Sequence, residues 1–178
     1  MLAKRKNILI AGIIAFFLLV DSGVLAYDSA GLYQKVKENA TQGDIYRSFM
    51  YLRQILREYP DSKFAKSALF SLGEFYFLTT NYQQAVHTLQ KFINKYPDSK
   101  LNIFVLSFLY EISKENKSLS NAQEIRNKII TFYQHSFLFR ESKTYSYTSA
   151  LLKNYKVQYF IDTIKFFIDE KPSFEIKF

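Results

Sequence analysis

Apolar residues in the middle of the chain recur at the spacing of one face of an α-helix. Leu69, Leu72 and Tyr76 are separated by three and then four residues, and Gly73 falls on the same face. A second apolar face follows the polar stretch 79–81 and comprises Tyr82, Ala85, Val86, Leu89, Phe92 and Ile93. The pattern predicts two antiparallel helices joined by a turn, with Gly73 and Ala85 at their closest approach.

This helical pattern returns at a step of 37 residues. The pentapeptide Tyr-Pro-Asp-Ser-Lys occurs at Tyr59–Lys63 and again at Tyr96–Lys100. Apolar positions keep the same step, as in Leu32, Leu69 and Leu106 or in Ile55, Phe92 and Ile129. A fixed period of this size is typical of a helical array. We predict a mainly α chain in which residues 27–139 form an α-α superhelix of about three helix-turn-helix repeats, over about 28–62, 63–99 and 100–139.

The hydrophobic period changes after residue 140, where apolar and polar residues begin to alternate. Segments 143–149, 155–160, 163–168 and 173–178 alternate in this way, with turn residues between them. They predict a small antiparallel β meander over 140–178, packed on the last helices of the array. Its apolar face would comprise Tyr155, Val157, Tyr159, Ile164, Phe166, Ile168, Phe174, Ile176 and Phe178. A helix over 157–168 is the alternative, because Phe160, Ile164 and Ile168 also share a helical face.

The repeats resemble the tetratricopeptide repeat. Residues 66–97 carry nearly all of that family's signature: an apolar residue, Leu72-Gly73, Tyr76, Ala85 and the closing Pro97. The resemblance implies a superhelix whose concave side is lined by the first helix of each unit and binds a protein or peptide partner. Within this family, the repeat sequence is similar to that of bacterial envelope proteins of the BamD and CpoB (YbgF, Tol–Pal) type. This similarity implies a scaffold in envelope assembly.

The family geometry implies a set of inward-facing residues that would form the partner groove. They are Tyr33, Lys37, Ser67, Phe70, Glu74, Phe77, Phe104, Ser107, Glu111 and Lys114. Phe70 and Phe77 flank Glu74 on one helix face, which suits a segment that presents apolar residues around a basic one. Ordinary core packing of the same rings is the alternative.

The N-terminus follows the plan of a secretory signal peptide. Lys4, Arg5 and Lys6 precede a 13-residue apolar run over 8–20, and small residues at Val24 and Ala26 suit a signal peptidase. We predict that residues 1–26 are removed after Ala26 and that the remainder is periplasmic. An uncleaved N-terminal membrane anchor facing the periplasm is the alternative, although the run is shorter than the roughly 18 residues of a spanning helix.

Charge, composition and the absence of catalytic motifs argue against nucleic-acid binding and catalysis. The formal net charge is +8, but the basic residues are spread along the chain, which predicts no nucleic-acid partner and at most peripheral contact with membrane or cell wall. The chain has no cysteine, and His87 and His135 are isolated. No metal-ligand spacing or glycine-rich phosphate loop occurs, so we predict no enzymatic activity, no cofactor and no metal.

Two functions fit these observations. The first is a non-catalytic periplasmic scaffold that mediates protein–protein interaction, in cell-envelope or outer-membrane assembly. The second is a structural or surface protein whose C-terminal β module binds a partner by strand addition at the edge over 173–178, with the repeats as support.

Overall fold

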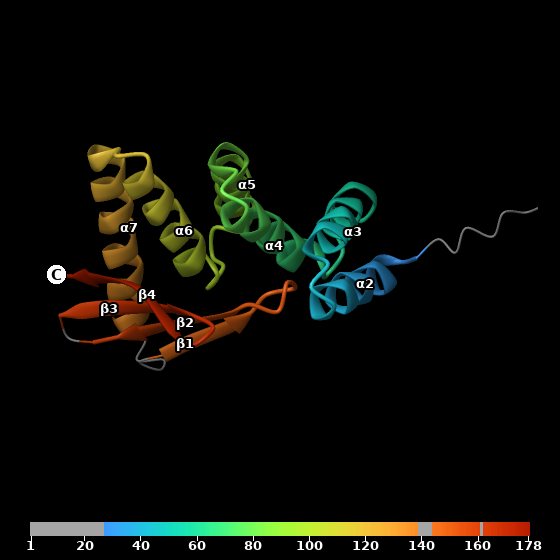
Figure 1. Cartoon of the computed structure of the whole chain (residues 1–178). Coiled ribbons are helices and arrows are strands. Elements are labelled where there is room, and N and C mark those ends of the chain that lie inside the picture. The colour runs from blue at the N-terminus through green and yellow to red at the C-terminus, as the bar shows by residue number, and fades with distance from the viewer. Residues whose placement is uncertain (1–26, 139–143, 161) are drawn as a thin grey trace, which may run out of the picture.

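The computed structural model describes residues 27–138, 144–160 and 162–178, with the backbone alone for 133–138. The predicted signal segment 1–26 therefore lies outside the described residues. Within these described residues, six helices in consecutive antiparallel pairs precede a four-stranded sheet. Figure 1 shows this arrangement. The helices are α2 (Ser29–Thr41), α3 (Ile45–Glu58), α4 (Ala65–Leu78), α5 (Tyr82–Lys95), α6 (Asn102–Glu115) and α7 (Leu119–Leu138). The fold class predicted from the sequence is confirmed. No helix in the described part of the chain combines the length and apolarity needed to cross a membrane.

Helices α2, α3 and α5 begin where the sequence supplies side chains that accept backbone hydrogen bonds. Asp28, Asp44 and Asn81 cap α2, α3 and α5, each accepting from the N–H three residues further on. The repeated pentapeptide makes the same turn twice. Its serine N–H donates to the carbonyl of Tyr59 in the first case and of Tyr96 in the second. The two junctions between helix pairs therefore share this backbone hydrogen bond.

In the middle repeat, α4 and α5 approach each other closely at Gly73. A Cβ atom added to Gly73 would stand 2.6 Å from Leu89 Cδ2, and Ala85 is fully buried on the facing helix. A larger side chain at either position would force the pair apart, because packed interiors leave no spare volume there. The tight packing predicted at Gly73 is confirmed, and the nearest atoms of α5 belong to Leu89 and Thr88.

The four strands form an antiparallel meander in the order β1-β2-β3-β4. Their bounds are β1 (Thr144–Thr148), β2 (Asn154–Tyr159), β3 (Thr163–Ile168) and β4 (Lys171–Lys177). The helical alternative for 157–168 is therefore wrong. Alternation sets the buried face, since Tyr155, Val157, Ile164, Phe166 and Ile176 all enter the main core. Phe178 is an exception to the predicted face, with 49% of its surface exposed.

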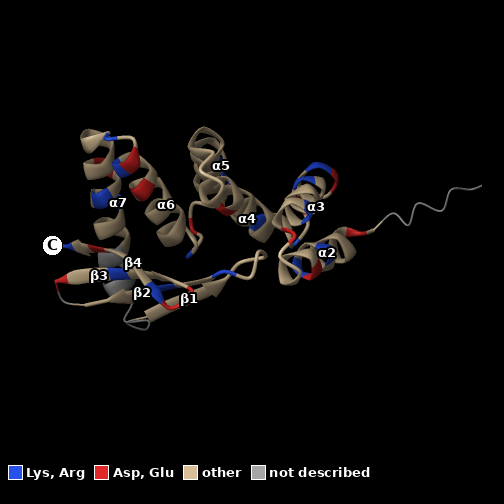
Figure 2. Ribbon diagram, in the orientation of Figure 1, with Lys and Arg blue, Asp and Glu red and all other residues tan. Residues whose placement is uncertain are grey.

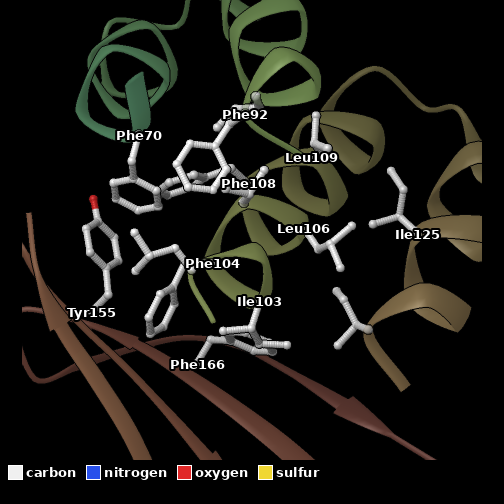
Figure 3. Packing of buried hydrophobic residues seen from close by; sticks show 14 of the residues in the cluster. Phe70, Phe92, Ile103, Phe104, Leu106, Phe108, Leu109, Ile125, Tyr155 and Phe166 are labelled. Carbon is white, nitrogen blue, oxygen red and sulfur yellow. The ribbon is translucent and has the colours of Figure 1, made fainter. Parts of the chain in front are cut away.

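The sheet lies across the helical array and shares one core with it. Figure 3 shows Tyr155 and Phe166 of the sheet facing Phe70, Phe104 and Phe108 of the helices. The turn between β1 and β2 reaches further along the array. Ala150 and Leu151 in this turn pack with Leu32, Val36, Leu52, Ile55, Ala68 and Phe75 of the first three helices. The β module is therefore part of the fold of the repeats.

Candidate functional site

The aromatic residues of the predicted groove lie beneath the sheet. Phe70 is fully buried, and its ring centroid is 5.2 Å from that of Tyr147 and 5.8 Å from that of Tyr155, both edge to face. Phe104 is also buried and stacks on Tyr145 with centroids 5.5 Å apart. These geometries are the favourable ones for aromatic pairs. The rings hold the array and the sheet together.

Glu74 lies at the centre of this boundary and is fully buried. Its Oε1 accepts hydrogen bonds from the Tyr155 hydroxyl at 2.7 Å and from the Ser149 hydroxyl at 2.9 Å. Ser71, one turn before it on α4, accepts from the backbone N–H of Ala150 at 3.0 Å. Oε2 of Glu74 has no hydrogen-bond partner among the described residues. This polar cluster fixes the β1–β2 turn on α4.

Burial controls the charge of this carboxyl group. Loss of hydration raises the pKa of Glu74 to about 7, and the hydrogen bonds from Tyr155 and Ser149 act against that rise. Burial and the neighbouring carboxyl together hold the pKa of Tyr155 well above its usual range. A buried carboxyl that gains a proton near neutral pH is suited to a structural role, because the neutral form costs less to bury.

The other predicted groove residues fall into two groups. Ser107 is buried and donates to the carbonyl of Phe104, and Phe77 is half-buried against Phe108, with centroids 4.7 Å apart. Tyr33 is half-buried and stacks on Phe64. The remaining residues are more accessible: Ser67 and Glu111 are half-buried, and Lys37 and Lys114 are exposed.

The structure therefore corrects the prediction of an open groove at Phe70, Glu74 and Phe104. All three side chains do lie on one side of the array, but the chain's own sheet covers them. A basic residue of a ligand therefore has no access to Glu74, which is fully buried. Lys114 lies 3.4 Å from Glu111 on its own helix. Phe70 and Phe104 pack in the core, which was the alternative interpretation of these rings.

A groove does open elsewhere, between α5, α6 and α7. Its volume is about 740 Å³, within the range of ligand and peptide sites. The floor is apolar and includes Leu106, Leu109, Ile112 and Ile125, three of which are labelled in Figure 3. The rim is polar and includes Gln90, Asn94, Asn116, Asn121, Glu124 and Lys128. We call this site the α5–α7 groove.

The rim of the α5–α7 groove is rich in amides and close to neutral. Glu124 and Lys128 form an ion pair at 2.7 Å, so their charges offset each other. Each Asn or Gln side chain offers both a donor and an acceptor, the same pair that a peptide backbone offers. Asn102, at the base, donates from Nδ2 to the carbonyls of Tyr96 and Pro97, and its Oδ1 lacks a partner among the described residues. The groove can therefore take an apolar segment and hydrogen-bond its backbone.

Sequence reasoning missed this groove because its shape depends on the spacing between repeats. In the sequence, the floor residues of the groove look like any other apolar positions on a helix face. The one available signal was the cluster of uncharged amides at positions 90, 94, 116 and 121. Within the described residues, no three His, Cys, Asp or Glu side chains come together as a metal site.

The comparisons with known proteins support the middle repeat in particular. Residues 67–99 match the tetratricopeptide repeat family model. The match supports a tetratricopeptide repeat protein. It covers most of α4, all of α5 and the turn after them, the unit that carries Gly73, Ala85 and Pro97. No curated protein matches the chain.

Proposed function

We propose that this chain is a non-catalytic periplasmic scaffold that binds another protein through the α5–α7 groove, in cell-envelope or outer-membrane assembly. Tetratricopeptide repeats typically mediate protein–protein interaction, and the match over 67–99 favours that role here. We choose this groove because the chain's own sheet covers the concave side of the array. Because Phe70 and Glu74 are covered by the sheet, a partner must use another surface.

The chemistry of the α5–α7 groove indicates the kind of partner. An apolar floor below a neutral amide rim suits a peptide segment or helix face with aliphatic side chains and few charges. A nucleic acid is disfavoured, because phosphate binding needs a concentrated basic surface. In Figure 2, Lys and Arg are distributed over the helices and the sheet instead.

The periplasmic location is supported by the sequence of residues 1–26, with its basic start and short apolar run. The role in envelope assembly follows from the resemblance of the repeats to BamD and CpoB type proteins. Mass spectrometry of the native protein tests the location. A chain that starts at Tyr27 in the periplasmic fraction supports export, whereas an intact Met1 in the membrane fraction favours the anchor.

Isosteric substitutions on the rim test the binding surface. Gln90→Glu combined with Asn94→Asp keeps the shape of the α5 rim but removes two amide donors and adds two charges. Gln83→Glu, on the exposed side of the same helix, is the matched control. Capture of a partner from envelope extract should fall tenfold or more for the double variant and stay unchanged for the control. Equal capture by all three chains would reject the groove.

Strand addition by the β module is the second candidate function, because the strand order leaves β1 and β4 at the edges of the sheet. Deletion of residues 141–178 cannot test it, since that deletion would expose Phe70 and Phe104 and unfold the array. A single proline on an edge strand is the better test. Ser173→Pro on β4 should abolish capture if this edge binds the partner, and should leave capture intact if the groove does.

A further inference from the structure

Exposed apolar side chains gather on the first half of α3 and the end of α4. Eight large apolar side chains are exposed within the described residues, and four of them lie here: Ile45, Tyr46, Met50 and Leu78. Tyr46 is 68% exposed and Met50 is 59% exposed. The other four stand at or beside the ends of separate elements. A cluster of exposed apolar side chains marks an interaction site, whereas single ones are ordinary.

Buried rings hold Tyr46 in one orientation. Its ring meets that of Phe75 on α4 edge to face, with centroids 5.5 Å apart. Phe75 is buried and stacks on Phe49 of α3, with centroids 4.4 Å apart. Phe49 in turn meets Tyr76 edge to face at 5.6 Å. Tyr46 therefore projects into solvent from a packed base, and a partner that binds it would lose little entropy in ordering it.

The same face of α3 continues into a cation that has no carboxylate partner. Tyr46, Met50 and Arg53 follow one another at four and three residues, so they share one side of the helix. The guanidinium of Arg53 lies 5.6 Å from the centre of the Phe49 ring, and no carboxylate pairs with it within the described residues. The charges of the other arginines on α3 are offset in the ion pairs Arg47–Asp44 and Arg57–Glu58. We call the four residues Tyr46, Phe49, Met50 and Arg53 the Tyr46–Arg53 face.

The Tyr46–Arg53 face is directed away from the rest of the fold. In Figure 1, α3 lies on the side of α2 that is turned away from the sheet. The described chain begins at Tyr27, whose carbonyl accepts a hydrogen bond from the Tyr59 hydroxyl just beyond the opposite end of α3. A chain that starts at Tyr27 therefore leaves this face open to a partner.

We propose that the Tyr46–Arg53 face binds a segment of another protein that presents an apolar side chain and a carboxylate. The apolar side chain packs on Tyr46 and Met50, and the carboxylate pairs with the planar guanidinium of Arg53. Position 53 lies seven residues after position 46, so the two groups of the partner are roughly 10 Å apart. Tyr, Met and Arg are the residue types enriched in protein interfaces.

A second copy of this chain fits the face less well. Its α3 brings another unpaired Arg53, and the carboxylates nearest to that face already form ion pairs with Arg47 and Arg57. The inference does not rest on the α5–α7 groove, which is lined by other helices. A scaffold with both surfaces can hold two partners at once.

Photochemical cross-linking identifies what binds. The full chain is expressed in its own cells with photoreactive benzoylphenylalanine at position 46, where one aromatic side chain replaces another. A chain with the same group at position 83, exposed on α5, is the control. Irradiation should cross-link position 46, and not position 83, to one segment of another protein. Mass spectrometry of that segment should show Asp or Glu beside apolar residues.

Affinities measured with that segment as a synthetic peptide test the contact itself. Arg53→Gln removes the charge, and its affinity for the peptide in fluorescence anisotropy should fall by about tenfold or more. Lys91→Gln removes a charge from an exposed position of α5, and its affinity should equal that of the wild type. The double variant Gln90→Glu with Asn94→Asp should also bind this peptide normally, because it changes only the α5–α7 groove. Both charge variants should melt as the wild type does, since Arg53 and Lys91 are exposed.

Four outcomes would overturn the inference. The first is cross-linking at position 46 that does not exceed cross-linking at position 83. The second is a cross-link only to a second copy or to another part of the same chain. The third is a bound segment without Asp or Glu. The fourth is an Arg53→Gln chain that binds the peptide as tightly as the wild type.

Discussion

Tyr155 donates a 2.7 Å hydrogen bond to Glu74 across the boundary between the sheet and the helical array. The two residues are 81 positions apart in the sequence, and both are buried. Glu74 belongs to α4 of the best-defined repeat, and Tyr155 to β2. The bond therefore ties a position that could have bound a partner to the chain's own C-terminal module.

The stability of the fold should fall as pH rises, because of Glu74. Its pKa is about 7 in the fold and 4.5 for an ordinary Glu, so the folded chain holds the proton more tightly than the unfolded chain. The stability gained from this tighter proton binding is fully present below about pH 4.5 and is lost as pH rises through 7. We expect the free energy of unfolding, from urea titrations, to drop by about 3 kcal/mol at most between about pH 5 and pH 8.

Glu74→Gln is the control for this pH dependence, because the amide does not titrate. The exposed carboxyl groups of Glu38, Glu58 and Glu124 have lowered pKa values, so they titrate below this range. The variant should show little change in stability over the same interval. A drop of equal size in Glu74→Gln would mean that another group is responsible.

Tyr155→Phe should destabilise the protein by about 1–3 kcal/mol, the typical cost of leaving a buried acceptor with one bond fewer. The phenylalanine ring preserves the contacts with Phe70 and Phe108. Loss of the hydroxyl should also move the pH at which stability falls to a higher value, since that hydrogen bond lowers the pKa of Glu74. Thermal melting at several pH values measures both effects. Tyr46→Phe, at a mostly exposed tyrosine, should melt as the wild type does.

Phe70→Ala should cost about 3–5 kcal/mol of folding stability, as expected for a large ring removed from a packed core. Met50→Ala is a suitable comparison, because 59% of Met50 is exposed on α3. Chemical denaturation should separate the two variants clearly. Similar denaturation midpoints would indicate that the sheet does not cover Phe70 in solution.

Ala85→Leu should destabilise the middle repeat by about 1–3 kcal/mol, because three extra carbon atoms enter a packed core in which Ala85 is fully buried. His87→Leu adds an apolar side chain of the same kind to the same helix, but at an exposed position. Its melting temperature should stay within a degree or two of the wild type, as is usual for surface changes. Equal shifts for both variants would contradict the helix register.

The local pattern predicted most of the fold. The 37-residue step placed the helix pairs, and alternation placed β3 at Thr163–Ile168, the bounds that the structure gives. Periodicity works here because it reports which face of an element is buried. The prediction that Phe178 lies on the buried face is wrong, because an alternating pattern does not indicate where a strand leaves the core.

The contacts between modules could not be predicted from the sequence. Phe70 has the same helical position whether it faces a ligand or a sheet, so only the tertiary arrangement decides its role. The α5–α7 groove is a second case, since its volume depends on how α6 and α7 stack on α5. Both features arise from packing between elements distant in sequence, which periodicity does not encode.

The turn between β1 and β2 changes how this array should fold. Repeats in an ordinary solenoid touch only their neighbours, so such arrays can unfold from one end in steps. Here Ala150 and Leu151, near the end of the chain, complete the core of the first helix pair. The first repeat therefore cannot finish folding until the last quarter of the chain is present. We expect the described helices and sheet to unfold in a single cooperative transition, and a growing chain to stay incompletely folded until its C-terminal strands emerge.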